Sequence, residues 1–253
     1  MSKSITFVGN GKMALALAKG LCETNTIEVI GRSMSAMEQF ERELRVPVKK
    51  TLYANADITN KTVILCVKPA NLSEIAPLLK GSAQTLYSVL AGTPLSALKS
   101  VHAHHYCRAM PNLAAEAGAS MTSLVGDNEI STNAIALFNT IGATLWLNSE
   151  KELDIATALA GSGPAYLALI AEALCDGAVR EGLKRDDAMV LMRGLFEGFG
   201  KLIQTVHPAI LKDNVMSPGG TTAAGYGALE KGNVRNGCME AIRAAHERAK
   251  GMK

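Results

Sequence analysis

Aromatic residues, paired cysteines and long apolar runs are all scarce in this chain of 253 residues. Aromatics make up 4% of the sequence, so the core must be built mainly from aliphatic side chains. The five cysteines form no C-x-x-C pair that would indicate zinc or redox chemistry, and free thiols in a reducing cytoplasm fit this spacing. No apolar run approaches the ~20 residues that span a bilayer and no signal peptide follows Met1, so we expect a cytoplasmic protein that does not enter a membrane.

A strong excess of one charge is also missing. The 26 basic residues are scattered among 23 acidic ones and leave a formal net charge of +3, so we expect no nucleic-acid partner. The hydrophobic content of 48% is that of a globular protein. Because the chain is longer than a typical domain of roughly 100 to 150 residues, two domains are expected, with one large domain as the alternative.

Short apolar runs alternate with helical patterns from Ile5 to about Leu147, which is typical of β-α-β units and a parallel sheet. The expected strands are residues 5–8, 27–30, 62–67, 85–89, 106–110 and 143–147. The first and third are almost uninterrupted, as strands covered on both faces should be. The pattern predicts an α/β fold, with a dinucleotide-binding Rossmann-type doubly wound sheet over residues 1–149.

After Ser149 no convincing strand follows, and residues 164–181, 186–206 and 233–250 carry apolar side chains at helical spacing. This predicts an all-helical domain over residues 150–253. Gly194, Gly198 and Gly200 each weaken an isolated helix by about 1 kcal/mol relative to alanine, so their presence suggests a close approach between helices and favours an oligomer.

The first expected strand runs into Gly9-Asn10-Gly11-Lys12-Met13-Ala14 and then into an apolar helix pattern. In this G-x-G-x-x-A arrangement Gly9 permits a tight turn, Gly11 leaves room for a pyrophosphate, and Ala14 lets the helix lie close to the sheet. The free N–H groups of the helix would face the phosphates. An ordinary tight turn between strand and helix is the alternative interpretation.

Where an NAD site usually has a carboxylate after the second strand, this chain has Arg32-Ser33. A guanidinium and a hydroxyl can bind a 2′-phosphate, so we predict NADPH as the cofactor, with NADH possible but less favoured. A solvated surface arginine is the alternative. Residues 67–69 and 91–94 follow the third and fourth strands and would line the same crevice, although Lys68 could equally be a surface lysine.

Two glycine-rich segments in the second half have no evident packing purpose: residues 160–166, which open a helical pattern, and residues 213–222. Consecutive N–H groups ahead of a helix form an anion site, so the second segment could hold a substrate carboxylate. A helix cap followed by a turn explains it equally well.

Taken together, these segments resemble the pyrroline-5-carboxylate reductase family over nearly the whole chain. The motifs that carry the resemblance are Gly9-x-Gly11-x-Met13, Val67-Lys68-Pro69, Arg108-Ala109-Met110-Pro111-Asn112, residues 161–166, and Asp213-Asn214-Val215-x-Ser217-Pro218-Gly219-Gly220-Thr221-Thr222. Ala14 departs from the glycine common in the first motif, at a position that usually tolerates alanine. The resemblance implies hydride transfer from NAD(P)H to the cyclic imine 1-pyrroline-5-carboxylate, giving L-proline in the last step of proline biosynthesis. It also implies a homodimer formed through the helical domain, which in some members assembles into a decamer.

The resemblance assigns roles to individual residues. Ser217, Thr221 and Thr222 would bind the substrate carboxylate, Glu150 would lie nearby and help to position the substrate, and Asn214 would lie where cofactor and substrate meet. The implied cofactor contacts are Gly9, Asn10, Gly11, Lys12, Met13, Arg32, Ser33, Asn55, Val67, Lys68, Pro69, Ala91 and Asn214. Asn55 follows a loop whose length varies in the family.

No obvious proton donor accompanies these residues. No tyrosine begins a Tyr-x-x-x-Lys, and no lysine follows residues 161–164 at the spacing of 3-hydroxyacid dehydrogenases. A cyclic imine that is already protonated needs no such acid, which favours catalysis by positioning, with Thr222 as a further partner for the ring nitrogen. The rival interpretations are a 3-hydroxyacid or ketopantoate-type dehydrogenase, which needs that lysine, and a non-catalytic dinucleotide-binding protein, which would not need residues 217–222.

Two other groups carry no function in this interpretation. His102, His104 and His105 lack a cysteine or carboxylate at ligand spacing, so we expect surface histidines and no metal. Cys66 and Cys107 fall in apolar strand patterns and should be inert thiols.

Overall fold

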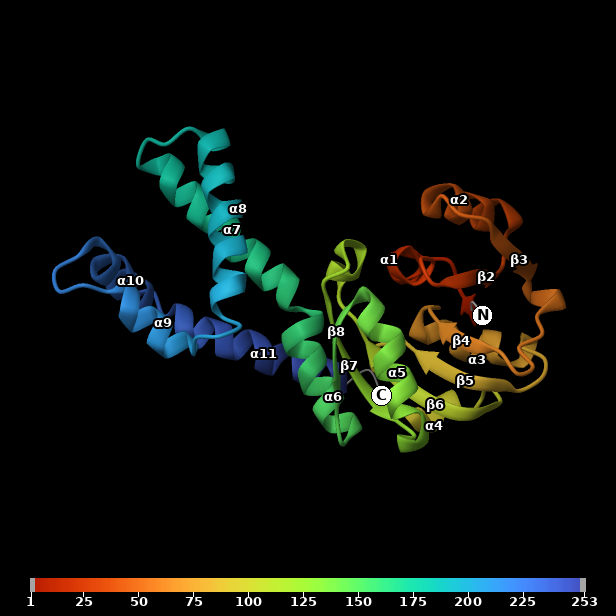
Figure 1. Ribbon diagram of the computed structural model, residues 1–253. Helices are drawn as coiled ribbons and strands as arrows, with labels where there is room; N and C mark the ends of the chain where they lie inside the picture. Colours follow the sequence, from red (N-terminus) through yellow and green to blue (C-terminus); the bar gives the residue numbers. More distant parts are fainter. Residues whose placement is uncertain (1–2, 251–253) are drawn as a thin grey trace. The chain divides into compact units, whose positions relative to one another are not determined.

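The computed structural model describes residues 3–250 and consists of two compact units (Figure 1). The first unit runs to Pro164 and takes in the chain from Ala244, and the second is Ala165–Arg243. The predicted boundary after residue 149 divides the chain by function, whereas these two units divide it by compactness. That boundary therefore stays a prediction. Residues 1–2 and 251–253, at the outer ends of the two predicted domains, lie outside the described residues.

An eight-stranded sheet forms the centre of the first unit, in the order β3-β2-β1-β4-β5-β6-β7-β8. The strands are β1 (Lys3–Val8), β2 (Asn25–Gly31), β3 (Val48–Leu52), β4 (Thr62–Leu65), β5 (Ala83–Ser88), β6 (Ala103–Met110), β7 (Ser120–Gly126) and β8 (Gly142–Trp146). Every neighbouring pair is parallel except β6 and β7, which are antiparallel. The predicted α/β fold is confirmed, and strand order reverses at β1 and β4, where doubly wound sheets bind their ligands.

Two of these strands were not predicted, because their sequences are polar. β3 places Lys49 and Lys50 on the edge of the sheet, and β7 contains three hydroxyl residues. Ser120 and Thr122 are nevertheless buried, and their hydroxyls lie 3.1 Å apart in a hydrogen bond that satisfies them inside the protein. Apolar content alone therefore missed strands whose polar groups find partners.

Helices cover both faces of this sheet. They are α1 (Lys12–Leu21), α2 (Met34–Leu44), α3 (Leu72–Ile75), α4 (Leu95–Leu98), α5 (Ser131–Phe138) and α6 (Glu150–Ala156). Short 3₁₀ turns are η1 (Tyr53–Asn55), η2 (Pro69–Asn71), η3 (Ala76–Leu78), η4 (Leu113–Ala117), η5 (Asn128–Ile130) and η6 (Asn139–Ile141), and η7 (Thr157–Gly161) is a π-helical turn. Residues of α1, α2 and α5 share one buried cluster and those of α3 and α4 share the other, so the two groups lie on opposite faces.

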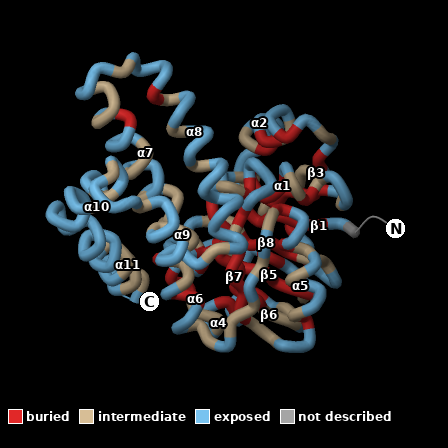
Figure 2. The backbone as a smooth tube through the Cα atoms, turned by 60° about the vertical axis from the view of Figure 1, so that its left-hand side comes forward, coloured by how far each residue is buried: buried red, intermediate tan, exposed pale blue. Residues whose placement is uncertain are grey.

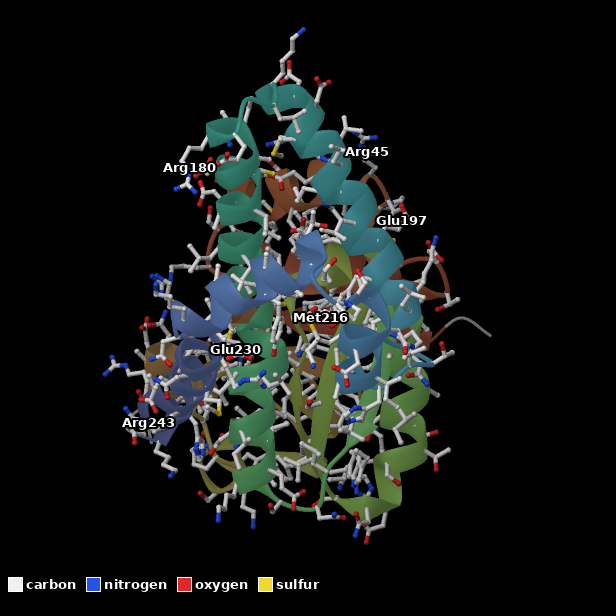
Figure 3. All side chains as sticks on the ribbon, turned by 90° about the vertical axis from the view of Figure 1, so that its left-hand side faces the viewer. Arg45, Arg180, Glu197, Met216, Glu230 and Arg243 are labelled. Carbon is white, nitrogen blue, oxygen red and sulfur yellow. The ribbon has the colours of Figure 1, made fainter. Side chains whose placement is uncertain are left out.

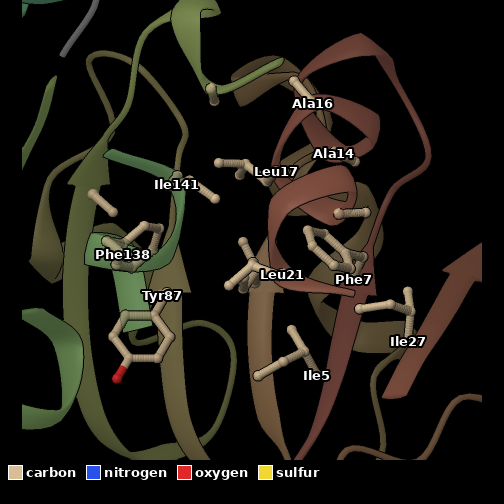
Figure 4. Packing of buried hydrophobic residues seen from close by; sticks show 14 of the residues in the cluster. Ile5, Phe7, Ala14, Ala16, Leu17, Leu21, Ile27, Tyr87, Phe138 and Ile141 are labelled. Atoms are coloured by element: carbon tan, nitrogen blue, oxygen red, sulfur yellow. The ribbon is translucent and has the colours of Figure 1, made fainter. Parts of the chain in front are cut away.

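The larger cluster shows how the strand and helix periods meet. Phe7 points to one face while Val8 belongs to the other cluster, as alternation along a strand requires. Leu17 and Leu21, one turn apart on α1, are fully buried over β1 (Figure 4). Tyr87 and Phe138 close the same layer with an edge-to-face contact at 5.5 Å between ring centroids. This packing fixes α1, and with it the glycine turn that precedes it.

The second unit is helical, as predicted for this half of the chain. It is built from α7 (Gly163–Arg180), α8 (Arg185–Leu202), α9 (Pro208–Val215), α10 (Thr221–Lys231) and α11 (Val234–Lys250), the first and last of which extend into the other unit. Among residues 165–243 the buried positions are Cys175 and Ala188, and Figure 2 shows the rest of these helices mostly exposed. The apolar side chains that predicted the helices therefore find little cover within this chain.

A continuous helical stretch, Glu150–Arg180, is long and apolar enough to cross a membrane by length and composition. The sequence expectation that no such stretch exists is corrected. It counted only unbroken apolar runs, whereas an 18-residue window of this helix reaches a mean hydropathy of 1.4 without being apolar throughout. One helix of this kind is weak evidence for a span.

Candidate active site

The β1–α1 turn has the backbone that its glycines predict. Gly9 has φ +100, and a Cβ added there would lie 2.9 Å from the carbonyl oxygen of Cys66. Its N–H donates to the carbonyl of Ile30 at 2.8 Å, which ties the turn to β2. Only glycine combines this conformation with this closeness to the β4 end of the sheet.

Gly11 has the opposite surroundings. It is the N-cap of α1, it makes no side-chain cap hydrogen bond, and a Cβ added to it would meet no atom within 4 Å. The space that glycine leaves is therefore open, as a turn that admits a pyrophosphate to the first-turn amides must be. Asn10 lies in the same turn, and Lys12 and Met13 are the first residues of α1, where Lys12 is exposed.

Arg32 and Ser33 follow β2, and Asn55 ends the η1 turn that follows β3, next to β2 in the sheet. Arg32 Nη2 lies 3.4 Å from Glu74 Oε1, and both side chains are about two-thirds exposed, at 69% and 64%. Arg32 also lines a hollow of about 410 Å³ with Leu52, Tyr53, Ala54, Glu74, Ile75 and Leu78. Burial raises the pKa of Tyr53, so its phenol stays neutral. An arginine beside a hollow lined with apolar side chains suits a nucleotide's phosphate and base.

The next two crevice loops follow β4 and β5. Lys68 is the exposed N-cap of η2 and Pro69 begins that turn, with Val67 half-buried before them. Ala91 is exposed beside Gly92, which has φ +70. The N–H of Val89 donates to the carbonyl of Leu65 at 3.1 Å, so the two loops leave adjacent strands side by side. All cofactor positions predicted before residue 100 thus lie after the carboxyl ends of β1 to β5.

A buried ionic cluster adjoins these loops, and sequence reasoning missed its centre. Arg108 of β6 is fully buried and pairs with two carboxylates of α6, Glu150 Oε1 at 2.8 Å and Asp154 Oδ1 at 3.1 Å. Glu150 Oε1 also accepts the N–H of Leu95 at 2.9 Å. An arginine inside an apolar strand, and carboxylates four residues apart on one helix face, were the available signals.

The segment that resembles a carboxylate-binding loop lies in the second unit. Residues 213–215 end α9 instead of forming a loop, so Asn214 is a helical residue. Gly219 has φ +69, and Gly220 is the N-cap of α10 without a side-chain cap hydrogen bond. Ser217, Thr221 and Thr222 are exposed around this helix start; Figure 3 marks Met216 in the loop before it and Glu230 near the end of α10.

The predicted residues therefore form two groups. The cofactor positions before residue 100 and Glu150 belong to the first unit. Asn214, which was predicted to contact the cofactor, belongs to the second unit with Ser217, Thr221 and Thr222.

Two groups of residues were expected to have no function. His102 and His104 are exposed as expected, whereas His105 is half-buried, with its Nδ1 3.9 Å from Asp127 Oδ2. Within residues 3–250 no group of three or more histidine, cysteine or acidic side chains is placed to hold a metal ion, and the absence of a metal stays a prediction. Burial raises the pKa of the Cys66 thiol and raises that of Cys107 to about 12, so both remain protonated thiols at neutral pH. Cys66 lies just beyond β4 and not inside it.

Sheet, glycine turn and crevice define a class, a dinucleotide-binding oxidoreductase. The sequence profile described as "NADP oxidoreductase coenzyme F420-dependent" matches residues 4–92, and the profile "Pyrroline-5-carboxylate reductase dimerisation" matches residues 150–252. The pyrroline-5-carboxylate reductase of Synechocystis is 35% identical, with 98% of each chain covered. The chain belongs to the pyrroline-5-carboxylate reductase family; it is an oxidoreductase that binds a nicotinamide cofactor.

Solved structures agree with this assignment. The 1-pyrroline-5-carboxylate reductase of Streptococcus pyogenes matches with a TM-score of 0.86 and 29% identity, covering 99% of each chain. The pyrroline carboxylate reductase of Plasmodium falciparum, solved with NADP bound, matches with a TM-score of 0.81 and 27% identity over 98% of this chain and 99% of that chain. The rival predictions, a dehydrogenase with a catalytic lysine and a non-catalytic binding protein, are therefore set aside.

Proposed function

We propose that this reductase uses NADPH in preference to NADH to convert 1-pyrroline-5-carboxylate to L-proline. The observation that carries the proposal is the Gly9 to Ala14 turn, with open space at Gly11, beside an arginine where NAD sites have a carboxylate. When bound, the dihydronicotinamide supplies the hydride. The relative solved with NADP bound supports the choice of cofactor.

On the cofactor side, the predicted residues make up three parts of the site: the binding points for the pyrophosphate and for the 2′-phosphate, and the wall of the crevice. The first-turn amides after Gly11 hold the pyrophosphate, with Asn10, Lys12 and Met13 around it. Arg32, Ser33 and Asn55 bind the 2′-phosphate, because a guanidinium and neutral donors at strand ends are suited to an anion. Val67, Lys68, Pro69 and Ala91 form a largely backbone wall along the crevice.

On the substrate side, the start of α10 binds the carboxylate. Its amides are uncapped by any side chain, and the hydroxyls of Ser217, Thr221 and Thr222 are exposed beside them. Asn214, one helix earlier, lies where substrate and cofactor meet. Glu150 helps to position the substrate from the start of the helical domain, which we place at residues 150–253, after a dinucleotide-binding domain at residues 1–149.

These residues orient the imine and supply no general acid. The ring nitrogen of the substrate carries its proton into the reaction, so the imine carbon accepts hydride directly and no alkoxide needs protonation. Thr222 hydrogen-bonds the ring nitrogen, and catalysis is mostly positioning.

The helical domain joins two copies into a homodimer, and such dimers can assemble further into a decamer. Leu169, Val190 and Leu191 are 67%, 65% and 63% exposed, although aliphatic side chains of this size favour burial. A Cβ added at Gly194, Gly198 or Gly200 meets no atom within 4 Å beyond the adjacent backbone of its own helix, so the close approach that these glycines suggest is made with a partner helix. The exposed face of the Glu150–Arg180 helix then packs against the partner subunit and not against lipid. The enzyme is cytoplasmic and binds neither a membrane nor nucleic acid.

NADPH absorbance with 1-pyrroline-5-carboxylate tests the proposal directly. The unsubstituted protein should oxidise NADPH only when the imine acid is present, and faster than it oxidises NADH. A Thr221→Ala, Thr222→Ala double variant should raise KM for the imine acid by roughly tenfold or more, as loss of anion contacts predicts. If Thr222→Ala instead lowers kcat by orders of magnitude at unchanged KM, positioning does not explain the catalysis.

A further inference from the structure

The β5–α4 loop, residues 89–94, has an unusual anchor. It precedes α4, a helix of only four residues whose N-cap is Pro94, and the side chain of Pro94 makes no capping hydrogen bond. The amide of Leu95, the first residue of α4, donates to Glu150 Oε1 at 2.9 Å, a carboxylate that lies 55 residues further along the chain. Helix starts are normally capped by a neighbour in sequence, so this cap links a crevice loop to the start of α6.

Arg108 holds that carboxylate in place. Its side chain is 1% exposed, and its two terminal nitrogens are divided between Glu150 at 2.8 Å and Asp154 at 3.1 Å. Arg108 also pairs in register with Ser88, the last residue of β5, so the cluster lies at the point where the loop begins. A buried guanidinium fixes its partners firmly, because separating them would leave an uncompensated charge inside the protein.

We infer that Arg108 and Glu150 are positioning residues for the cofactor, which act by fixing the β5–α4 loop against the crevice. The inference rests on the proposed function, in which Ala91 of this loop contacts the cofactor. It deepens the role proposed for Glu150: the carboxylate positions the substrate indirectly, by holding a wall of the crevice.

Asp154 provides a matched control. It accepts from the same guanidinium and is 3% exposed, but the hydrogen bond from Leu95 goes to Glu150. Asp154→Asn should therefore lower stability without freeing the loop. Glu150→Ala removes the cap itself, and Glu150→Gln restores part of it because an amide oxygen can still accept the Leu95 N–H.

Two measurements without substrate test the inference. Hydrogen–deuterium exchange on cofactor-free protein should show the peptide covering residues 89–98 exchanging at least fivefold faster in Glu150→Ala, less so in Glu150→Gln, and unchanged in Asp154→Asn. Fluorescence titration should give a Kd for NADPH raised about fivefold to tenfold by Glu150→Ala and within twofold of the original in Asp154→Asn.

The opposite pattern overturns the inference. If Glu150→Ala leaves both loop exchange and the NADPH Kd unchanged while KM for the imine acid rises, Glu150 contacts the substrate and does not anchor the loop. Equal effects of Glu150→Ala and Asp154→Asn on the Kd would also overturn it, because a general loss of stability would then explain both. The exchange measurement needs no cofactor, whereas failure of the unsubstituted protein to bind NADPH would count against the proposed function itself.

Discussion

The ion pair between Arg32 and Glu74 allows the preference for NADPH over NADH to be tested by removing either the positive or the negative charge. Arg32 Nη2 and Glu74 Oε1 are 3.4 Å apart on an exposed surface. NADPH differs from NADH by a 2′-phosphate with a charge of about −1.5 to −2 at neutral pH, as phosphate monoesters have. The arginine attracts this group and the glutamate repels it, so the two substitutions should move the preference in opposite directions.

The magnitudes follow from the exposure of the pair. A charge-assisted hydrogen bond contributes about 1.5–3 kcal/mol, and discounting for solvent leaves roughly 1–2 kcal/mol. Arg32→Ala should therefore lower kcat/KM for NADPH by about fivefold to thirtyfold, at 1.36 kcal/mol for each factor of ten. The value for NADH should change little, because NADH has no 2′-phosphate.

Glu74→Gln should act in the other direction and more weakly. For charges about 6 Å apart in water, Coulomb repulsion is about 0.7 kcal/mol for each unit charge, or about 1.2 kcal/mol for a phosphate carrying about −1.75. Screening at physiological ionic strength roughly halves this to about 0.6 kcal/mol, so kcat/KM for NADPH should rise about threefold. In 1 M salt the gain should vanish.

Steady-state kinetics with both cofactors, at low and high salt, check the two variants and their double mutant. A wild-type protein that prefers NADH, or an Arg32→Ala variant that loses both cofactors equally, would refute the assignment of Arg32. If Glu74→Gln changes kcat/KM for NADH as much as for NADPH, the glutamate acts on the shared part of the nucleotide and the electrostatic reasoning fails.

Three further outcomes are expected. Gly11→Ala should have the same melting temperature as the unsubstituted protein but bind NADPH at least tenfold more weakly in a titration, because its added Cβ has space only while the crevice is empty. Gly9→Ala should also lower the free energy of unfolding by about 1–3 kcal/mol, because Gly9 has φ +100 and the added Cβ would lie 2.9 Å from the carbonyl oxygen of Cys66. Burial alone would raise the pKa of Glu28, but hydrogen bonds from lysine and threonine side chains outweigh burial and lower that pKa. Glu28→Gln should therefore lower the free energy of unfolding, measured with denaturant near pH 7, by about 1–3 kcal/mol. The loss should become smaller as the pH falls through the folded-state pKa, because the carboxylate is then protonated in the unsubstituted protein too. Leu191→Glu should give a monomer by light scattering with little reductase activity, and a dimer of normal activity would disprove the proposed interface.

The sequence predicted the parts of the fold in which local pattern and tertiary packing agree. The glycine turn was predicted because Gly9 permits a tight turn and Gly11 leaves open space beside the helix start. The structure shows a positive φ at Gly9 and open space at Gly11, as expected. The strands with lysines and hydroxyl residues, β3 and β7, were not, because their stability depends on neighbours brought together by the fold. Arg108 falls within a recognisable motif, but the sequence gives it no role, because its two carboxylate partners lie more than 40 residues away and pairing over that distance leaves no local pattern.

The helical half shows that a pattern can predict a helix correctly without showing what covers its apolar face. Leu191 and Leu195 stand at helical spacing on α8, yet they are 63% and 57% exposed within the chain. Full burial of a leucine contributes about 1.5–3 kcal/mol, so a face with several such residues favours association strongly. The start of α10, the proposed carboxylate site, belongs to the same sparsely buried unit, so we expect its geometry to depend on the partner surface that covers this unit. Because a second copy is the partner that the family match indicates, assembly and substrate binding are expected to be coupled in this protein.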